Sequence, residues 1–155
     1  MEREVYLDNS ATTRVREEVA AVVLEAMTRQ YGNPSSLHRK GIEAERLVQG
    51  ARETIARSLG VKGDEIYFTS GGTEANNLAL QGAARARSRR GKHIITTAIE
   101  HPSVLNTCAR LAEEGFRVTY LPVNREGVLD PAELQASITP ETILVSTMFV
   151  NNEIG

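Results

Sequence analysis

The alternation of β-prone and helical segments after Ile66 is the feature that most limits the folds open to this chain. Short runs rich in Ile, Val and Thr alternate there with longer segments whose apolar residues recur at helical spacing. The expected strands cover residues 66–69, 93–97, 118–121 and 142–147, and the expected helices cover 73–86, 103–114 and a segment that opens at Asp130-Pro131. This order implies an α/β fold with a mostly parallel sheet flanked by helices and joined by right-handed crossovers.

The chain before Ile66 has a different pattern. Residues 5–7 are apolar and stop at a turn, which is typical of a strand or an extended arm. Two amphipathic helices are expected at 15–30 and 37–59, separated by the loop 32–36 and ended by Gly60. We therefore expect an N-terminal arm over 1–13 and, over 14–155, an α/β domain that is cut before its end.

The charge of the chain bears on which partners are expected. The net charge of −2 and the pI near 6.0 give no electrostatic reason to expect nucleic acid or an anionic membrane surface. The basic stretch 85–92 is interpreted as a solvated helix end, the alternative being a nucleic-acid patch. We expect a cytoplasmic protein without a membrane span, since the start of the chain lacks the apolar segment of a secretory signal.

The turn Ser70-Gly71-Gly72-Thr73-Glu74 lies between an expected strand and an expected helix. Its glycines allow a sharp turn, and the free N–H groups at the start of a helix suit a phosphate. The equally weighted alternative is an ordinary strand-to-helix turn. A Walker phosphate loop is excluded because no lysine follows the glycines at the required spacing, and no dinucleotide-binding fingerprint is present.

Two further polar segments follow expected strands. His101, in Glu100-His101-Pro102-Ser103, could stack on a planar cofactor or carry protons, or it could simply bond to the backbone of its loop. Asn152, in Asn151-Asn152-Glu153, could donate to a phenolate or carboxylate, or serve only in a turn.

These three segments are expected to meet at one edge of one sheet, because the carboxyl ends of parallel strands share an edge. A phosphate cradle, an aromatic ring and an amide donor together fit an aromatic cofactor that carries a phosphate. No metal site is predicted. Cys108 is expected to pack inside the helix 103–114 as a small hydrophobic residue, the alternative being a nucleophile.

The chain resembles the cysteine desulfurases of the NifS/IscS type, in the class V aminotransferase group of pyridoxal-phosphate (PLP) enzymes. Five segments carry this resemblance in the order and spacing of the family. They are YLDNSATT (6–13), GNPSSLH (32–38), FTSGGTE (68–74), EHPSVL (100–105) and VNNEIG (150–155).

The resemblance implies a PLP-dependent transferase of fold type I, with 14–155 as the N-terminal part of its large PLP-binding domain. It implies that Gly72 and Thr73 contact the PLP phosphate, although the family often has alanine at position 72. His101 is implied to stack on the pyridine ring as a candidate acid/base group, and Asn152 to bond the phenolic oxygen. The loop 33–36 is implied to lie toward the interface of a homodimer.

The implied activity removes sulfur from L-cysteine, which gives L-alanine and a persulfide on the enzyme for an iron–sulfur scaffold or another sulfur acceptor. The family's Schiff-base lysine lies in a Ser-x-His-Lys block, and Lys40, Lys62 and Lys92 all lack that context. Cys108 does not match the family's sulfur-accepting cysteine. We therefore expect a truncated domain, inactive alone. The alternatives are part of a selenocysteine lyase or another class V enzyme, and a non-catalytic remnant that binds a partner.

Overall fold

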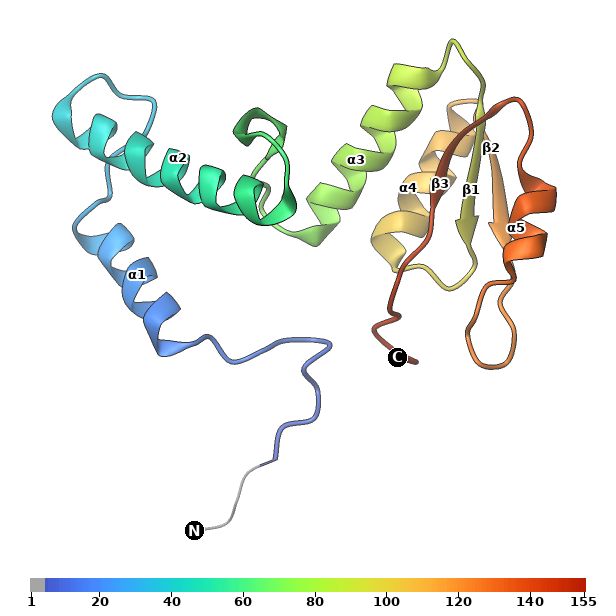
Figure 1. Cartoon of the computed structure of the whole chain (residues 1–155), viewed down its shortest axis with the longest axis horizontal. Coiled ribbons are helices and arrows are strands. Elements are labelled where there is room, and N and C mark those ends of the chain that lie inside the picture. Colours follow the sequence, from blue (N-terminus) through green and yellow to red (C-terminus); the bar gives the residue numbers. More distant parts are fainter. Residues whose placement is uncertain (1–4) are drawn as a thin grey trace. The chain divides into compact units, whose positions relative to one another are not determined.

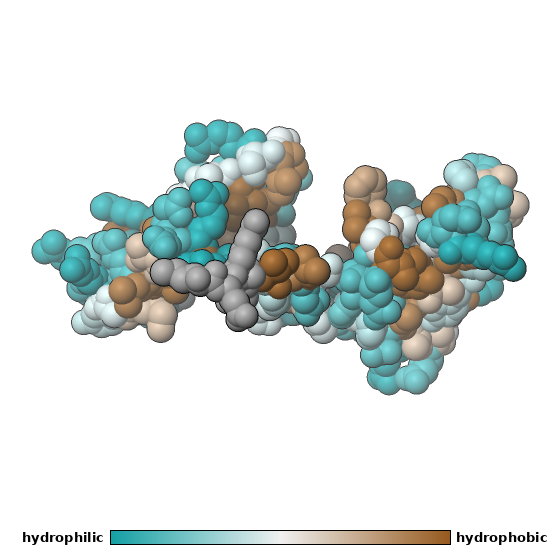
Figure 2. Space-filling view, turned by 90° about the horizontal axis from the view of Figure 1, so that it is seen from below, coloured by the Kyte–Doolittle hydropathy of each residue, from teal (hydrophilic) through white to brown (hydrophobic). Residues whose placement is uncertain are grey.

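The computed structural model describes residues 5–155, which divide into a unit that ends at Phe68 and a second unit, Thr69–Gly155 (Figure 1). Residues 1–4, the start of the expected arm, lie outside the described part. Hydrophobic surface is exposed on both units (Figure 2). We describe each unit by itself.

The first unit contains α1 (Glu17–Thr28), α2 (Arg39–Leu59) and the 3₁₀ turn η1 (Gly63–Glu65). The helices lie where the hydrophobic spacing predicts them, within two residues at each end. Gly60 ends α2 in the left-handed conformation (φ 68°), as glycine does at many helix C-termini. The apolar stripe of α1 has no buried residue, and Val19 and Val22 are 51% and 59% exposed.

The expected strand 66–69 is wrong. These residues pair with no strand among the described residues, although their composition is β-prone. Strand formation needs a partner edge as well as suitable side chains.

The second unit is an α/β layer. Its elements are α3 (Gly72–Arg87), β1 (His93–Thr97), α4 (Pro102–Glu113), β2 (Arg117–Leu121), α5 (Pro131–Ser137) and β3 (Thr142–Ser146). The strand order is β2-β1-β3 and both pairings are parallel, which confirms the expected α/β class and parallel sheet. The helix expected at Asp130-Pro131 also forms, with the Asp130 carboxylate accepting from the Ala132 N–H at 2.8 Å.

The core of this unit lies where α3 and α4 pack on the sheet. All five residues of β1 are buried, as expected for the central strand of a parallel sheet. The buried cluster comprises Leu80, Ala84, Ile94, Val104, Cys108, Leu111 and Phe116. Because β1 and β3 run parallel, the loops that follow them leave the sheet at the same edge (Figure 1).

Candidate functional site

The loops that follow β1 and β3 form a small pocket at the carboxyl edge of the sheet. It has a volume of about 280 Å³ and is lined by residues 98–102 and 151–154. This edge is where open α/β sheets generally bind ligands. The structure therefore brings His101 and Asn152 to one pocket, as the order of the strands predicts.

His101 occupies the N-cap position of α4. Its Nδ1 accepts a hydrogen bond from the backbone N–H of Ser103 at 3.0 Å and lies 2.8 Å from the Ser103 hydroxyl. Pro102 takes the first helical position, where a missing N–H costs nothing. The histidine is thus bonded to the backbone of its loop, and its ring is still exposed beside the pocket.

The two asparagines of the second loop have different surroundings. Asn151 Nδ2 donates to the Ile99 carbonyl at 2.8 Å, and its Oδ1 accepts from the N–H groups of Glu153 and Ile154 at 2.7 and 3.1 Å. The side chain of Asn152 is exposed and makes no hydrogen bond within residues 5–155. Asn151 therefore shapes the loop, whereas Asn152 keeps a free amide at the pocket.

Glu100 joins the two loops from inside the protein. The residue is only 6% exposed, and its Oε1 accepts from the Thr97 hydroxyl at 2.8 Å and from the Met148 N–H at 2.7 Å. Thr97 ends β1, and Met148 follows β3. This carboxylate therefore fixes the spacing of the two strand ends that carry His101 and Asn152.

The turn at the start of α3 offers unused donors. The Ser70 N–H and hydroxyl donate to Glu74 Oε2 at 2.6 and 2.7 Å, and these bonds, the backbone one first, hold the pKa of the Glu74 carboxyl below 4.5. The N–H groups of Gly72 and Thr73 have no acceptor among the described residues. Apart from its chain neighbours and the backbone of its own helix, no atom lies within 4 Å of where a Cβ on Gly72 would be, so alanine fits there as well.

The start of α3 and the pocket are connected by one side-chain hydrogen bond. Asn76, just over one turn into α3, donates from Nδ2 to the Ser103 hydroxyl in the first turn of α4 at 2.8 Å. His101 and Asn152 thus line one pocket. Gly72 and Thr73 do not line it, but their helix is bonded to α4 beside it.

The donor set fits PLP. Backbone N–H groups at a helix start suit its phosphate, an exposed aromatic ring suits its pyridine face, and a free amide suits its phenolic oxygen. Gly72, Thr73, His101 and Asn152 are the residues that would hold these parts.

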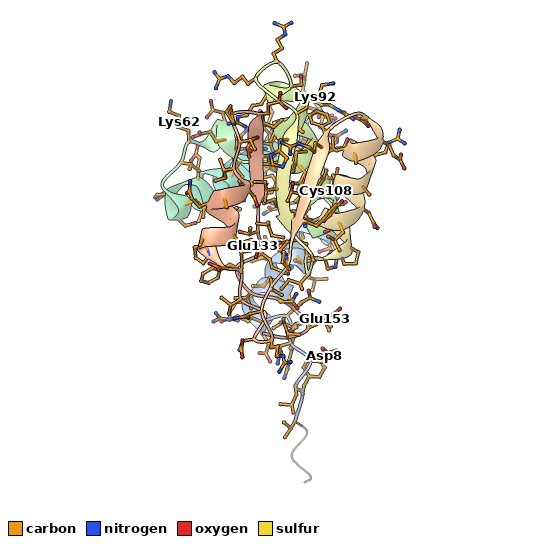
Figure 3. All side chains as sticks on the ribbon, turned by 90° about the vertical axis from the view of Figure 1, so that its right-hand side faces the viewer. Asp8, Lys62, Lys92, Cys108, Glu133 and Glu153 are labelled. Atoms are coloured by element: carbon orange, nitrogen blue, oxygen red, sulfur yellow. The ribbon has the colours of Figure 1, made fainter. Side chains whose placement is uncertain are left out.

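Cys108 and Lys92 lie away from the pocket. Cys108 is fully buried between α4 and the sheet, and burial raises the pKa of its thiol, which confirms the expected packing role (Figure 3). Lys92 precedes β1 and lies at the end of the unit opposite Glu153 (Figure 3). It is therefore at the wrong edge of the sheet to reach the pocket.

Three residues of the site were not identified from the sequence in these roles: Glu100, Asn76 and Ser103. Glu100 carried a usable signal, because an acidic residue directly after a buried strand needs partners to be buried itself. Asn76 and Ser103 carried none, since 27 positions separate them and only the packing of α3 on α4 brings them together.

Comparison with known proteins identifies the class. The model of the aminotransferase class-V family matches residues 5–155, so the chain belongs to that family. No helix within residues 5–155 is long and apolar enough to cross a membrane.

Individual relatives are cysteine desulfurases, which confirms the predicted resemblance. The chain is 52% identical over 155 residues to the cysteine desulfurase IscS of Dictyoglomus turgidum, covering all of this chain and 39% of the relative. A solved NifS-like protein matches with a TM-score of 0.93 at 44% identity, over 99% of this chain and 42% of the other. A structure described as SspA in complex with cysteine matches with a TM-score of 0.87 at 39% identity, over 96% and 43%. The chain thus spans about two fifths of these relatives.

Proposed function

We propose that this chain forms the cofactor-holding part of a PLP-dependent cysteine desulfurase that takes sulfur from L-cysteine and leaves L-alanine and an enzyme persulfide. The observation that carries the proposal is the pocket where the His101 ring and the free Asn152 amide meet. The Asn76–Ser103 hydrogen bond links this pocket to the helix whose first N–H groups are unused. The relatives named as cysteine desulfurases and the relative solved with cysteine support the substrate.

In this proposal each of the four residues contacts a defined part of the cofactor. Gly72 and Thr73 donate backbone N–H groups to the phosphate, and Asn152 donates its amide to the phenolic oxygen. His101 lies against the ring and is the candidate acid/base group. When bound, PLP supplies an electron sink that weakens bonds at the carbon bearing the amino group.

The wider assignments are also proposals. Residues 1–13 form an arm and 14–155 belong to the large PLP-binding domain. The protein is a cytoplasmic homodimer that passes sulfur to an iron–sulfur scaffold or another acceptor protein. The exposed apolar residues of the first unit, such as Leu37 at 96% and Val22 at 59%, support burial against another surface.

The residues of this chain alone do not complete the chemistry in this proposal. Lys92 is at the opposite edge of the sheet, and the buried thiol of Cys108 is shielded from a substrate. We expect residues 1–155 with added PLP and cysteine to release no sulfide or alanine. Release of either product would contradict this expectation.

The decisive experiment removes one backbone donor without changing the fold. Gly72 is the first residue of α3, where proline is tolerated, so Gly72→Pro deletes the N–H while the helix still forms. We expect a PLP affinity about 10- to 100-fold lower, because a hydrogen bond to a charged group contributes about 1.5–3 kcal/mol.

The matched control is Gly72→Ala, which keeps the N–H and meets no atom in the turn. It should bind PLP as the original protein does. Equal affinity in the alanine and proline variants would refute the phosphate site. Turnover of selenocysteine in strong preference to cysteine by the full-length enzyme would refute the substrate.

A further inference from the structure

Asn76, Ser103 and His101 form a continuous chain of hydrogen bonds from α3 to the pocket. Asn76 Nδ2 donates to Ser103 Oγ at 2.8 Å, and Ser103 Oγ lies 2.8 Å from His101 Nδ1. The backbone N–H of Ser103 reaches the same ring nitrogen at 3.0 Å. Ser103 is only 6% exposed, so its hydroxyl has little access to water.

The chemistry of these groups fixes the direction of each hydrogen. A backbone N–H can only donate, so His101 Nδ1 must present a lone pair and carry no proton. The Ser103 hydroxyl then donates to Nδ1, because two facing lone pairs would leave that contact without a hydrogen. Its oxygen accepts from Asn76, which is the donor in that pair. In the neutral ring the one remaining proton therefore lies on Nε2.

We infer that Asn76 and Ser103 are positioning residues that hold His101 as the neutral tautomer with its proton on Nε2. The inference rests on the proposed function, since it specifies what His101 offers to the cofactor. The ring presents a flat face and a hydrogen-bond donor at Nε2, while its basic nitrogen is occupied as the cap of α4. In this state His101 offers the cofactor a ring face and the Nε2–H donor.

The cap of α4 uses the lone pair at His101 Nδ1. A proton on Nδ1 would face the Ser103 N–H, and that N–H has no other acceptor among the described residues. The cap bond would therefore be lost. Because Asn76 lies just over one turn after Gly72, the helix that offers donors to the phosphate also sets the ring of His101.

The test measures the tautomer of His101 by ¹⁵N nuclear magnetic resonance of the histidine-labelled protein, with PLP removed and with PLP bound. The His101→Gln variant assigns the signal. Asn76→Asp replaces a donor with an acceptor, so its carboxylate takes the Ser103 hydrogen and leaves the Ser103 oxygen able to accept from Nδ1–H. We expect the minor Nδ1–H population to rise several-fold in this variant.

The matched control is Asn77→Asp, the same change at the next residue, whose amide donates to the Thr73 carbonyl of its own helix. It should leave the His101 tautomer unchanged. Ser103→Ala should raise the Nδ1–H population as Asn76→Asp does, and Ser103→Thr should restore the original state because it keeps a hydroxyl.

A His101 that is mainly Nδ1–H in the original protein, or a tautomer unaffected by Asn76→Asp in a folded variant, would overturn the inference. Circular dichroism checks that each variant is folded. The measurement without PLP separates this inference from the proposed function, because the hydrogen-bond chain is complete within the protein. Failure of PLP to bind would refute the proposed function and leave the tautomer result standing.

Discussion

Asn151 ties the two loops of the site together, because its Nδ2 donates to the Ile99 carbonyl at 2.8 Å across 52 positions of sequence. Its oxygen is also occupied, by the N–H groups of Glu153 and Ile154. Its neighbour Asn152 lines the same pocket with a free amide. Of two adjacent residues of one type, Asn151 therefore holds the loop structure, and Asn152 is the one proposed to bind the ligand.

Replacing each asparagine by alanine should separate these roles. Asn151→Ala leaves the Ile99 carbonyl and two N–H groups without partners, so we expect the free energy of unfolding to fall by about 1–3 kcal/mol. Asn152→Ala should change it by less than about 0.5 kcal/mol and should weaken PLP binding instead. Urea denaturation and an absorbance titration with PLP measure the two effects. A large loss of stability in Asn152→Ala, with little change in Asn151→Ala, would show that Asn152 is the structural residue.

Glu100 should be essential to the spacing of the loops. In Glu100→Ala the Thr97 hydroxyl and the Met148 N–H lose their acceptor, at a cost of about 1–3 kcal/mol for each buried group. Glu100→Gln keeps an oxygen that can accept both bonds and should be markedly more stable than the alanine variant. Thermal and urea unfolding of the two variants measure this difference. Equal stabilities would mean that these two hydrogen bonds do not hold the loops.

Much of the second unit could be predicted from sequence because its signals are local. The strand 93–97 is a short β-prone run, and Asp130-Pro131 is a helix start recognisable from two residues. His101 and Asn152 directly follow strands, and a single rule about parallel sheets places both at one edge. The packing of Cys108 followed from its place in an amphipathic helix.

The remainder depended on contacts between distant residues. The run 66–69 has suitable side chains for a strand, but its state depends on a partner that local composition does not reveal. Ser103 was recognisable only as part of a helix start, because its link to Asn76 exists only once α3 and α4 pack together. For the same reason the sequence could not decide whether His101 binds a cofactor or bonds to the backbone of its loop. In the structure it caps α4 and also lines the pocket.

Cys108 should behave as a buried apolar residue. Its thiol is fully buried and its pKa is raised, chiefly by burial, so a thiol reagent should modify it no faster than the protein unfolds. Cys108→Ala should lower the free energy of unfolding by about 1 kcal/mol and leave the affinity for PLP unchanged. Cys108→Ser buries a hydroxyl and should be less stable than the alanine variant. Rapid modification of the folded protein at Cys108 would contradict its packing role.

His93 should make the stability of the protein depend on pH. The residue is 1% exposed at the start of β1, and its ring nitrogens each lie 2.8 Å from a hydroxyl, that of Thr142 and that of Thr119. Burial, and then the positive charge of Arg117, lower the pKa of His93 below its ordinary value of 6.5. Below about pH 6.5 the unfolded chain therefore takes up a proton at this residue that the folded protein does not.

The free energy of unfolding should consequently fall as the pH is lowered from about 6.5 toward the folded-state pKa, by at most about 1.4 kcal/mol per pH unit from this residue. His93→Asn should remove this part of the pH dependence, even though it lowers stability at every pH. His38→Asn is the control, because His38 is an exposed cap of α2 and asparagine caps helices well. Urea denaturation at about pH 7.5 and about pH 5.5 measures the difference. If both variants keep the pH dependence of the original protein, His93 is not the group responsible for it. The buried ring of His93 would then accept a proton as readily in the folded protein as in the unfolded chain.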